Sequence, residues 1–155
     1  MLDLSLFVLI LTADRVTKMI IPQYLDLHQT LPVIPSFFNL TYVRNSGGAF
    51  GMLSGWDSPL RRAFFIGASL CAIILLGYLY KQARSGQSPV LRLSLVILGA
   101  GAFGNLYDRA VTGQVVDFLD FFAGPYHWPA FNVADSAITV GAVVLISILV
   151  TGQTD

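Results

Sequence analysis

The feature that most limits the fold is an uncharged apolar segment, residues 63–80, which has arginines just before it and a lysine just after it. A helix needs about 20 mainly apolar residues to cross the hydrocarbon core of a bilayer. Three other segments are of similar character, and the chain as a whole is 55% hydrophobic and only 12% charged. We therefore predict one integral membrane domain, residues 1–155, mainly α in class, with spans at about 4–21, 63–80, 90–107 and 132–150.

Two connecting segments, at about residues 22–60 and 108–131, are too polar to cross a membrane. Pro22 is predicted to end the first span. Residues 37–43 favour a β-strand, and Asn45 with the serine and glycines after it favours a tight turn. The predicted fold is therefore a four-transmembrane-helix protein with a small β element outside the membrane. Both termini lie on one side of the membrane and both connecting segments on the other.

Several classes of protein are excluded by what the chain lacks. The formal net charge is zero and the nine basic residues are scattered, so no basic face is available for nucleic acid. The two histidines, His28 and His127, are far apart, and no HExxH or CxxC pattern occurs. We therefore expect no metal and no cofactor. The chain also has no GxSxG pattern, which disfavours a serine nucleophile.

Acidic and basic side chains gather between the third and fourth predicted spans. An ionised side chain costs about 2.5–3.5 kcal/mol near the centre of a membrane span even on the mildest scale, so charges here are functional candidates. Asn105, Asp108 and Arg109 have the spacing i, i+3, i+4 and share one helix face. Gly99, Gly101 and Gly104 in the same span would let helices approach closely.

Asp117 and Asp135 have surroundings that suit acid and base chemistry. Large apolar residues enclose Asp117, and burial of that kind raises the pKa of a carboxyl group. Asp135 falls in the first turn of the fourth predicted helix, where the helix dipole favours a negative charge. Two such carboxylates can share a proton, as in aspartic peptidases. A helix-capping pair of Asn132 and Asp135 is the structural alternative.

Three further polar residues allow two interpretations each. Asp14 and Lys18 are four residues apart, so they lie on one helix face in the order that favours an ion pair. This pair either neutralises itself at the membrane interface or supports a site. Asn45 is either a turn residue or a site residue.

Five segments of the chain, taken together and in order, resemble the lipoprotein signal peptidases, also called signal peptidase II. The segments are Asp14-Arg15-Val16-Thr17-Lys18, Arg44-Asn45-Ser46-Gly47-Gly48-Ala49-Phe50, Gly101-Ala102-Phe103-Gly104-Asn105-Leu106-Tyr107-Asp108-Arg109, Gly113-Gln114-Val115-Val116-Asp117-Phe118 and Phe131-Asn132-Val133-Ala134-Asp135. They cover nearly the whole chain. Gly48 and Ala100 depart mildly from the family pattern.

The resemblance implies an aspartic endopeptidase with Asp117 and Asp135 as its catalytic pair. It would remove the signal peptide of a diacylglyceryl-modified prolipoprotein on the amino side of the lipidated cysteine. The implied partners are this substrate, membrane lipid and the cyclic peptide antibiotics that inhibit the family. The family positions that line or support the site fall on Asp14, Lys18, Asn45, Asn105, Asp108, Arg109 and Asn132.

The resemblance and the charge distribution disagree on orientation. The family lies in the bacterial cytoplasmic membrane with cytoplasmic termini and an active site near the outer face. A bare count of basic residues would instead put the connecting segments in the cytoplasm. We follow the resemblance, because several of these basic residues adjoin aspartates. The alternative function is a small proton-coupled transporter or accessory membrane protein, in which the same charges would form a relay.

Overall fold

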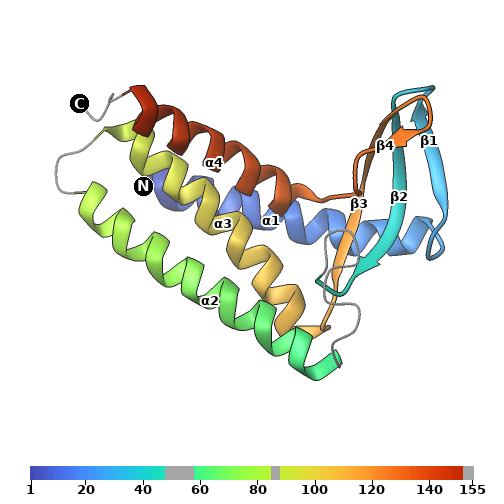
Figure 1. Ribbon diagram of the computed structural model, residues 1–155, viewed down its shortest axis with the longest axis horizontal. Helices are drawn as coiled ribbons and strands as arrows, with labels where there is room; N and C mark the ends of the chain where they lie inside the picture. The colour runs from blue at the N-terminus through green and yellow to red at the C-terminus, as the bar shows by residue number, and fades with distance from the viewer. Residues whose placement is uncertain (48–57, 85–87, 152–155) are drawn as a thin grey trace.

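The computed structural model describes residues 1–47, 58–84 and 88–151. It is mainly helical with a small antiparallel sheet, as predicted. The helices are α1 (Leu2–Tyr24), α2 (Ser58–Ala83), α3 (Pro89–Val111) and α4 (Val133–Thr151), and the strands are β1 (Thr30–Ile34), β2 (Phe38–Asn45), β3 (Val115–Ala123) and β4 (Tyr126–His127). The sheet lies at one end of the helices, and both chain termini lie toward the other end (Figure 1).

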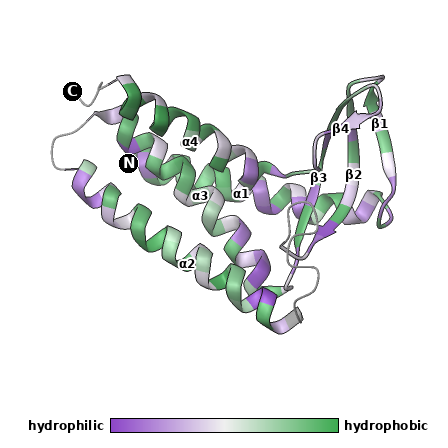
Figure 2. Cartoon of the chain, viewed as in Figure 1, coloured by the Kyte–Doolittle hydropathy of each residue, from purple (hydrophilic) through white to green (hydrophobic). Residues whose placement is uncertain are grey.

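Three of the helices within the described residues, α2, α3 and α4, are long and apolar enough to cross a membrane by length and composition. Figure 2 shows that apolar residues dominate these helices and that polar residues gather toward the sheet. Helix α1 differs because it carries Asp3, Asp14, Arg15 and Lys18. The partners of these charges are described below with the site.

The helix ends differ from the predicted ones by a few residues. Pro22 does not end the first helix but lies inside α1, which continues to Tyr24. Proline removes one backbone hydrogen bond, but the helical pattern continues after it, since the N–H of Leu25 still donates to the backbone oxygen of Ile21 at 3.0 Å. Helix α3 continues past the predicted end at residue 107 to Val111, so Asp108 and Arg109 are helical. A charged residue ends an apolar run in sequence without ending the helix.

The two connecting segments form a single sheet, which the sequence did not indicate. The predicted strand at residues 37–43 is confirmed as β2, and it pairs on one side with β1. On its other side β2 pairs with β3, which comes from the second connecting segment. The register places Val43 opposite Asp117 and Asn45 opposite Val115. This pairing brings the first connecting segment beside Asp117.

Helix α3 is the central helix and packs against α1, α2 and α4. Glycine permits the close approach to α4: a Cβ atom on Gly101 would lie 2.4 Å from the backbone oxygen of Ala134, and one on Gly141 would lie 2.8 Å from Cγ of Leu98. The expectation of close packing fails for Gly99, where a Cβ atom would meet nothing within 4 Å. Close packing against α4 therefore fixes where the start of that helix lies relative to α3.

A small apolar core attaches the sheet to the end of α1. It consists of Ile21, Leu25, Tyr42 and Phe118, all less than a tenth exposed. Residues of α1, β2 and β3 thus meet in one cluster. This cluster holds the strand that carries Asp117 against the helix that carries Asp14 and Lys18.

A polar cluster joins three helices at the opposite end of the bundle. Asp3 accepts a hydrogen bond from the Tyr80 hydroxyl at 2.7 Å and pairs with Nε of Arg92 at 3.0 Å. Beside it, α1, α2 and α3 line an apolar cavity of about 300 Å³. Among the described residues that line this cavity, Asp3 is the one that is acidic. The cavity therefore lacks the paired carboxylates that acid and base catalysis would use.

Candidate active site

Asn132 connects the two aspartates that the sequence singles out. Its side-chain nitrogen donates to Oδ1 of Asp117 at 2.6 Å, and its backbone N–H donates to Oδ2 of Asp135 at 3.2 Å. Its side-chain oxygen accepts the N–H of Asp135 at 2.9 Å. The predicted capping pair therefore exists and is a reciprocal capping box at the start of α4. Asn132 is 0% exposed, so its two carboxylate partners are held in fixed positions.

Asp117 is buried on β3 and receives two amide hydrogen bonds. Besides Asn132, the side chain of Asn45 donates to its Oδ2 at 3.0 Å. The oxygen of the same Asn45 amide accepts the N–H of Gly47 at 2.8 Å, so Asn45 is a turn residue and a site residue at once. Burial raises the pKa of Asp117 to about 6, against the lowering effect of these amides, and the nearby Asp135 carboxylate adds to the rise.

Asp135 is half-buried in the first turn of α4. Its Oδ1 accepts a hydrogen bond from the side-chain nitrogen of Asn105 at 2.7 Å. The oxygen of that amide in turn accepts from Nζ of Lys18 at 3.0 Å. Because Lys18 can only donate, it fixes which way the Asn105 amide points.

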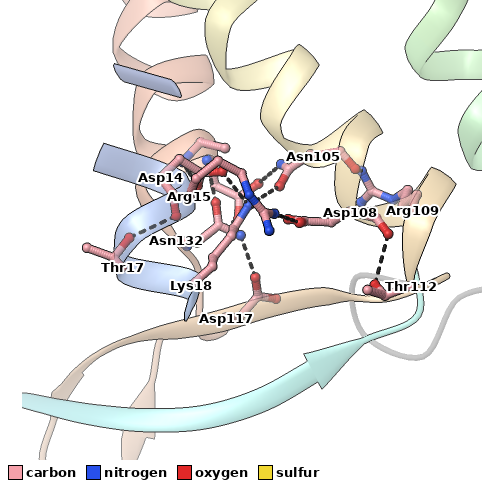
Figure 3. Close-up of polar contacts among 12 residues, drawn as sticks. Asp14, Arg15, Thr17, Lys18, Asn105, Asp108, Arg109, Thr112, Asp117 and Asn132 are labelled. Carbon is pink, nitrogen blue, oxygen red and sulfur yellow. Dashed lines mark hydrogen bonds and ion pairs between the residues drawn. The ribbon is translucent and has the colours of Figure 1, made fainter. Parts of the chain in front are cut away.

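Lys18 is the centre of a buried ionic network, which Figure 3 shows between α1 and α3. Its ammonium group contacts Oδ2 of Asp14 at 2.8 Å, Oδ2 of Asp108 at 2.7 Å and Asn105. The contacts to Asp14 and Asn105 are hydrogen bonds, and the contact to Asp108 is an ion pair. Asp14 also accepts the backbone N–H of Ala134 at 2.9 Å. The Asp14 and Lys18 pair is therefore bonded to Asn105 and to the first turn of α4 and is not an isolated pair.

Arg15 is a further member of this network that the sequence did not assign to the site. It is ion-paired with Oδ1 of Asp108, and its guanidinium carbon lies 4.5 Å from the centre of the Tyr107 ring. Its position next to Asp14 was the only signal. Asp120, in contrast, is bound by Asn39 and His127 and is not joined to the network by any hydrogen bond among the described residues.

Arg109 lies beside the two aspartates without a hydrogen bond to either. The one hydrogen bond of its side chain within the described residues is long, 3.4 Å from Nη1 to the backbone oxygen of Asn105. Its Nε is buried and has no partner there. The guanidinium carbon instead lies 5.3 Å from the centre of the Phe65 ring on α2. Among the described residues, the Arg109 guanidinium group is thus held by one long hydrogen bond and one aromatic contact.

A cleft of about 500 Å³ leads to this group of residues between α2, α3 and α4. Small side chains line its α2 wall, including Ala68, Ser69 and Ala72. Asn105, Arg109 and Asp135 lie on its other walls. The cleft is thus apolar along most of its length and carries acid, amide and guanidinium groups at one place. No group of three or more His, Cys, Asp or Glu side chains among the described residues could hold a metal ion.

The helices have the length and composition of membrane spans, and the apolar cleft between them is lined by Asp135, which Asn132 connects to a second amide-bound aspartate, Asp117. Together these features define the class of a membrane enzyme with acid and base groups. Solved structures agree with this class. One bacterial membrane enzyme, solved by the in meso method, superimposes with a TM-score of 0.84 at 35% identity and covers 96% of this chain and 87% of its own. A second has a TM-score of 0.80, also at 35% identity, and covers 95% and 91%.

Sequence comparison identifies the family. The model of signal peptidase II matches residues 6–151. A lipoprotein signal peptidase of Desulforapulum autotrophicum is 48% identical over 89% of this chain and 85% of its own length, and one of Syntrophus aciditrophicus is 46% identical over 94% and 89%. The chain belongs to the signal peptidase II family of bacterial membrane aspartic peptidases. The comparisons do not support the alternative of a transporter.

Proposed function

We propose that this chain removes the signal peptide from diacylglyceryl-modified prolipoproteins, cutting on the amino side of the lipidated cysteine, with Asp117 and Asp135 as the catalytic pair. The observation that carries the assignment of the pair is that Asn132 binds both carboxylates beside the cleft. The names of the relatives support the choice of substrate.

In the proposed reaction, one carboxylate takes a proton from water while the other, in its protonated form, donates a hydrogen bond to the scissile carbonyl oxygen. The water oxygen forms a bond to the carbonyl carbon, and the resulting diol collapses as the C–N bond breaks and the leaving nitrogen takes a proton. We assign the shared proton to Asp117, because burial raises its pKa to about 6. Asp135, at the start of a helix, is better placed to carry negative charge as the base.

The cleft suits a substrate that arrives within the membrane. A signal peptide and a diacylglyceryl group are both apolar, and both can enter between α2 and α4 from the lipid. Family inhibitors of the cyclic peptide class would compete for the same cleft. We further propose that α1 is a fourth span: its charges at Asp14, Arg15 and Lys18 are all paired, which lowers the cost of placing them in a membrane.

The proposed function is tested with purified protein in detergent and a synthetic precursor peptide carrying a diacylglyceryl cysteine. Mass spectrometry identifies the cleaved bond. We expect cleavage before the lipidated cysteine, no cleavage of the unlipidated peptide, and inhibition by a cyclic peptide antibiotic of the family. Absence of cleavage by well-folded protein would overturn the proposal.

The site is expected to work without a metal ion, because its groups at the cleft are amides, a guanidinium and the two aspartates. Initial rates measured with and without excess EDTA should agree. A rate that falls with EDTA and returns with zinc would contradict the aspartic mechanism.

The proposed orientation has cytoplasmic termini and the sheet near the outer face. Single cysteines test it in a background that carries Cys71→Ala. An impermeant thiol reagent applied to spheroplasts should label Ala123→Cys, at the exposed tip of the sheet, and should spare Thr151→Cys, at the exposed end of α4. The reverse result would place the aspartates on the cytoplasmic side.

Arg62 lies near the start of α2, on the face that we propose to be the outer one. Arg62 donates from Nε to the backbone oxygen of Arg109 at 3.0 Å and from Nη2 to that of Ala110 at 2.6 Å. It therefore caps the carboxyl end of α3, where the helix dipole favours a positive charge. The fold thus gives a reason for Arg62 to lie on this face. The count of basic residues is therefore a weaker argument for placing the connecting segments in the cytoplasm.

A further inference from the structure

We infer that Phe65 is a positioning residue that holds Arg109 close to Asp135 while keeping the two side chains from forming an ion pair. The inference rests on the proposed peptidase function and adds a residue to it. Phe65 lies on α2, the cleft wall opposite the aspartates, in an apolar span where the sequence gives no signal of a role.

The Phe65 ring is held against two parts of the site. The guanidinium carbon of Arg109 lies 5.3 Å from its centre, within the range of a cation–π contact. The ring also presses against Gly47, where a Cβ atom would lie 2.3 Å from Cδ2 of the ring. Gly47 follows Asn45, which binds Asp117. Phe65 therefore contacts the segment that holds one aspartate and the arginine that lies near the other.

The backbone around Phe65 is fixed relative to Arg109. Arg62, one helical turn earlier on α2, bonds to the backbone oxygens of Arg109 and Ala110. Residues three apart share one face of a helix, so the same face of α2 carries both contacts to the end of α3. The Phe65 ring is thus kept at the level of the Arg109 guanidinium.

Among the described residues, few contacts hold the Arg109 side chain. It has one long hydrogen bond and a buried Nε without a partner among the described residues. Asp135 lines the same cleft as Arg109, so their opposite charges attract each other. An ion pair with Asp135 would occupy the carboxylate assigned as the base. The Phe65 ring offers the guanidinium an alternative partner that leaves Asp135 free.

The test compares Phe65→Leu, Phe65→Met and Phe65→Tyr in cleavage assays with the lipidated peptide. Leucine and methionine remove the aromatic face, whereas tyrosine keeps it. We expect kcat to fall about tenfold for the first two with KM changed less than twofold, and to stay near the wild-type value for Phe65→Tyr. Phe103→Leu, the same change at an exposed position of α3, is the matched control.

A double-mutant cycle with Arg109→Met decides whether Phe65 acts through Arg109. If it does, Phe65→Leu has no further effect on kcat in the Arg109→Met background. An equal loss in both backgrounds, or wild-type kcat in both Phe65→Leu and Phe65→Met, would overturn the inference. These outcomes all require a wild-type protein that cleaves. A wild-type protein that does not cleave would instead contradict the proposed function.

Discussion

Asp117→Asn and Asp135→Asn are each expected to reduce cleavage of a lipidated precursor by at least about 10²-fold while the protein remains folded. Asparagine nearly matches the shape of aspartate but can neither take a proton from water nor hold the shared proton. Each replacement also keeps an oxygen that can accept the amide hydrogen bonds of Asn132 or Asn105. Single-turnover assays at saturating substrate, with size-exclusion profiles to check folding, measure the effect.

Asp120→Asn is the matched control for these two variants. Asp120 lies three residues after Asp117 on β3, so its side chain points to the opposite face of the strand. It accepts from Asn39 at 2.8 Å and contacts His127, and an asparagine oxygen can keep one of these bonds. Most activity should survive. If Asp117→Asn is as active as Asp120→Asn, the assignment of the catalytic pair is wrong.

Lys18→Met is expected to cost about 3–5 kcal/mol of stability, because it leaves Asp14 and Asp108 buried without their shared cation. Both carboxylates are at most 5% exposed, so water cannot replace the ammonium group. The orientation of Asn105, and with it a hydrogen bond to Asp135, should be lost as well. Unfolding in mixed micelles of increasing denaturing detergent measures the loss.

Two further variants show whether the uncompensated charge is the cause. Lys81→Met removes an exposed lysine near the end of α2 and should leave stability unchanged. In Lys18→Met, Asp108 keeps its ion pair with Arg15, whereas Asp14 has no other cation among the described residues. Adding Asp14→Asn removes that unpaired charge and keeps an acceptor for the N–H of Ala134, so part of the stability should return. No recovery in the double variant would mean that packing, and not charge, explains the effect.

The helices could be predicted from sequence because uncharged apolar runs are a strong and local signal. Their ends could not. Asp108 closes an apolar run, and only the structure places Lys18 and Arg15 against it, which allows α3 to continue into its charged end. Pairing of this kind joins residues far apart in the chain, and no local pattern records it.

In the candidate site, too, local spacing could be predicted from the sequence and long-range pairing could not. Spacing alone placed Asp14 with Lys18 on one face, and Asn105 with Asp108 and Arg109 on another, and the structure brings these two faces together. Strand β3 was missed, because its pairing partner β2 lies in a distant segment. Phe65 was also missed, since one more apolar residue in an apolar span changes no pattern.

The hydrogen bond from the N–H of Ala134 to Asp14 has a consequence for biogenesis. It joins α1 to the start of α4, the first and last helices among the described residues. Until α4 leaves the translocation machinery and inserts, Asp14 lacks this donor, Asn105 lacks Asp135, and Asp117 lacks Asn132. A chain in which α4 has not yet inserted therefore lacks one aspartate of the proposed catalytic pair in its place, and we expect such a chain to be inactive.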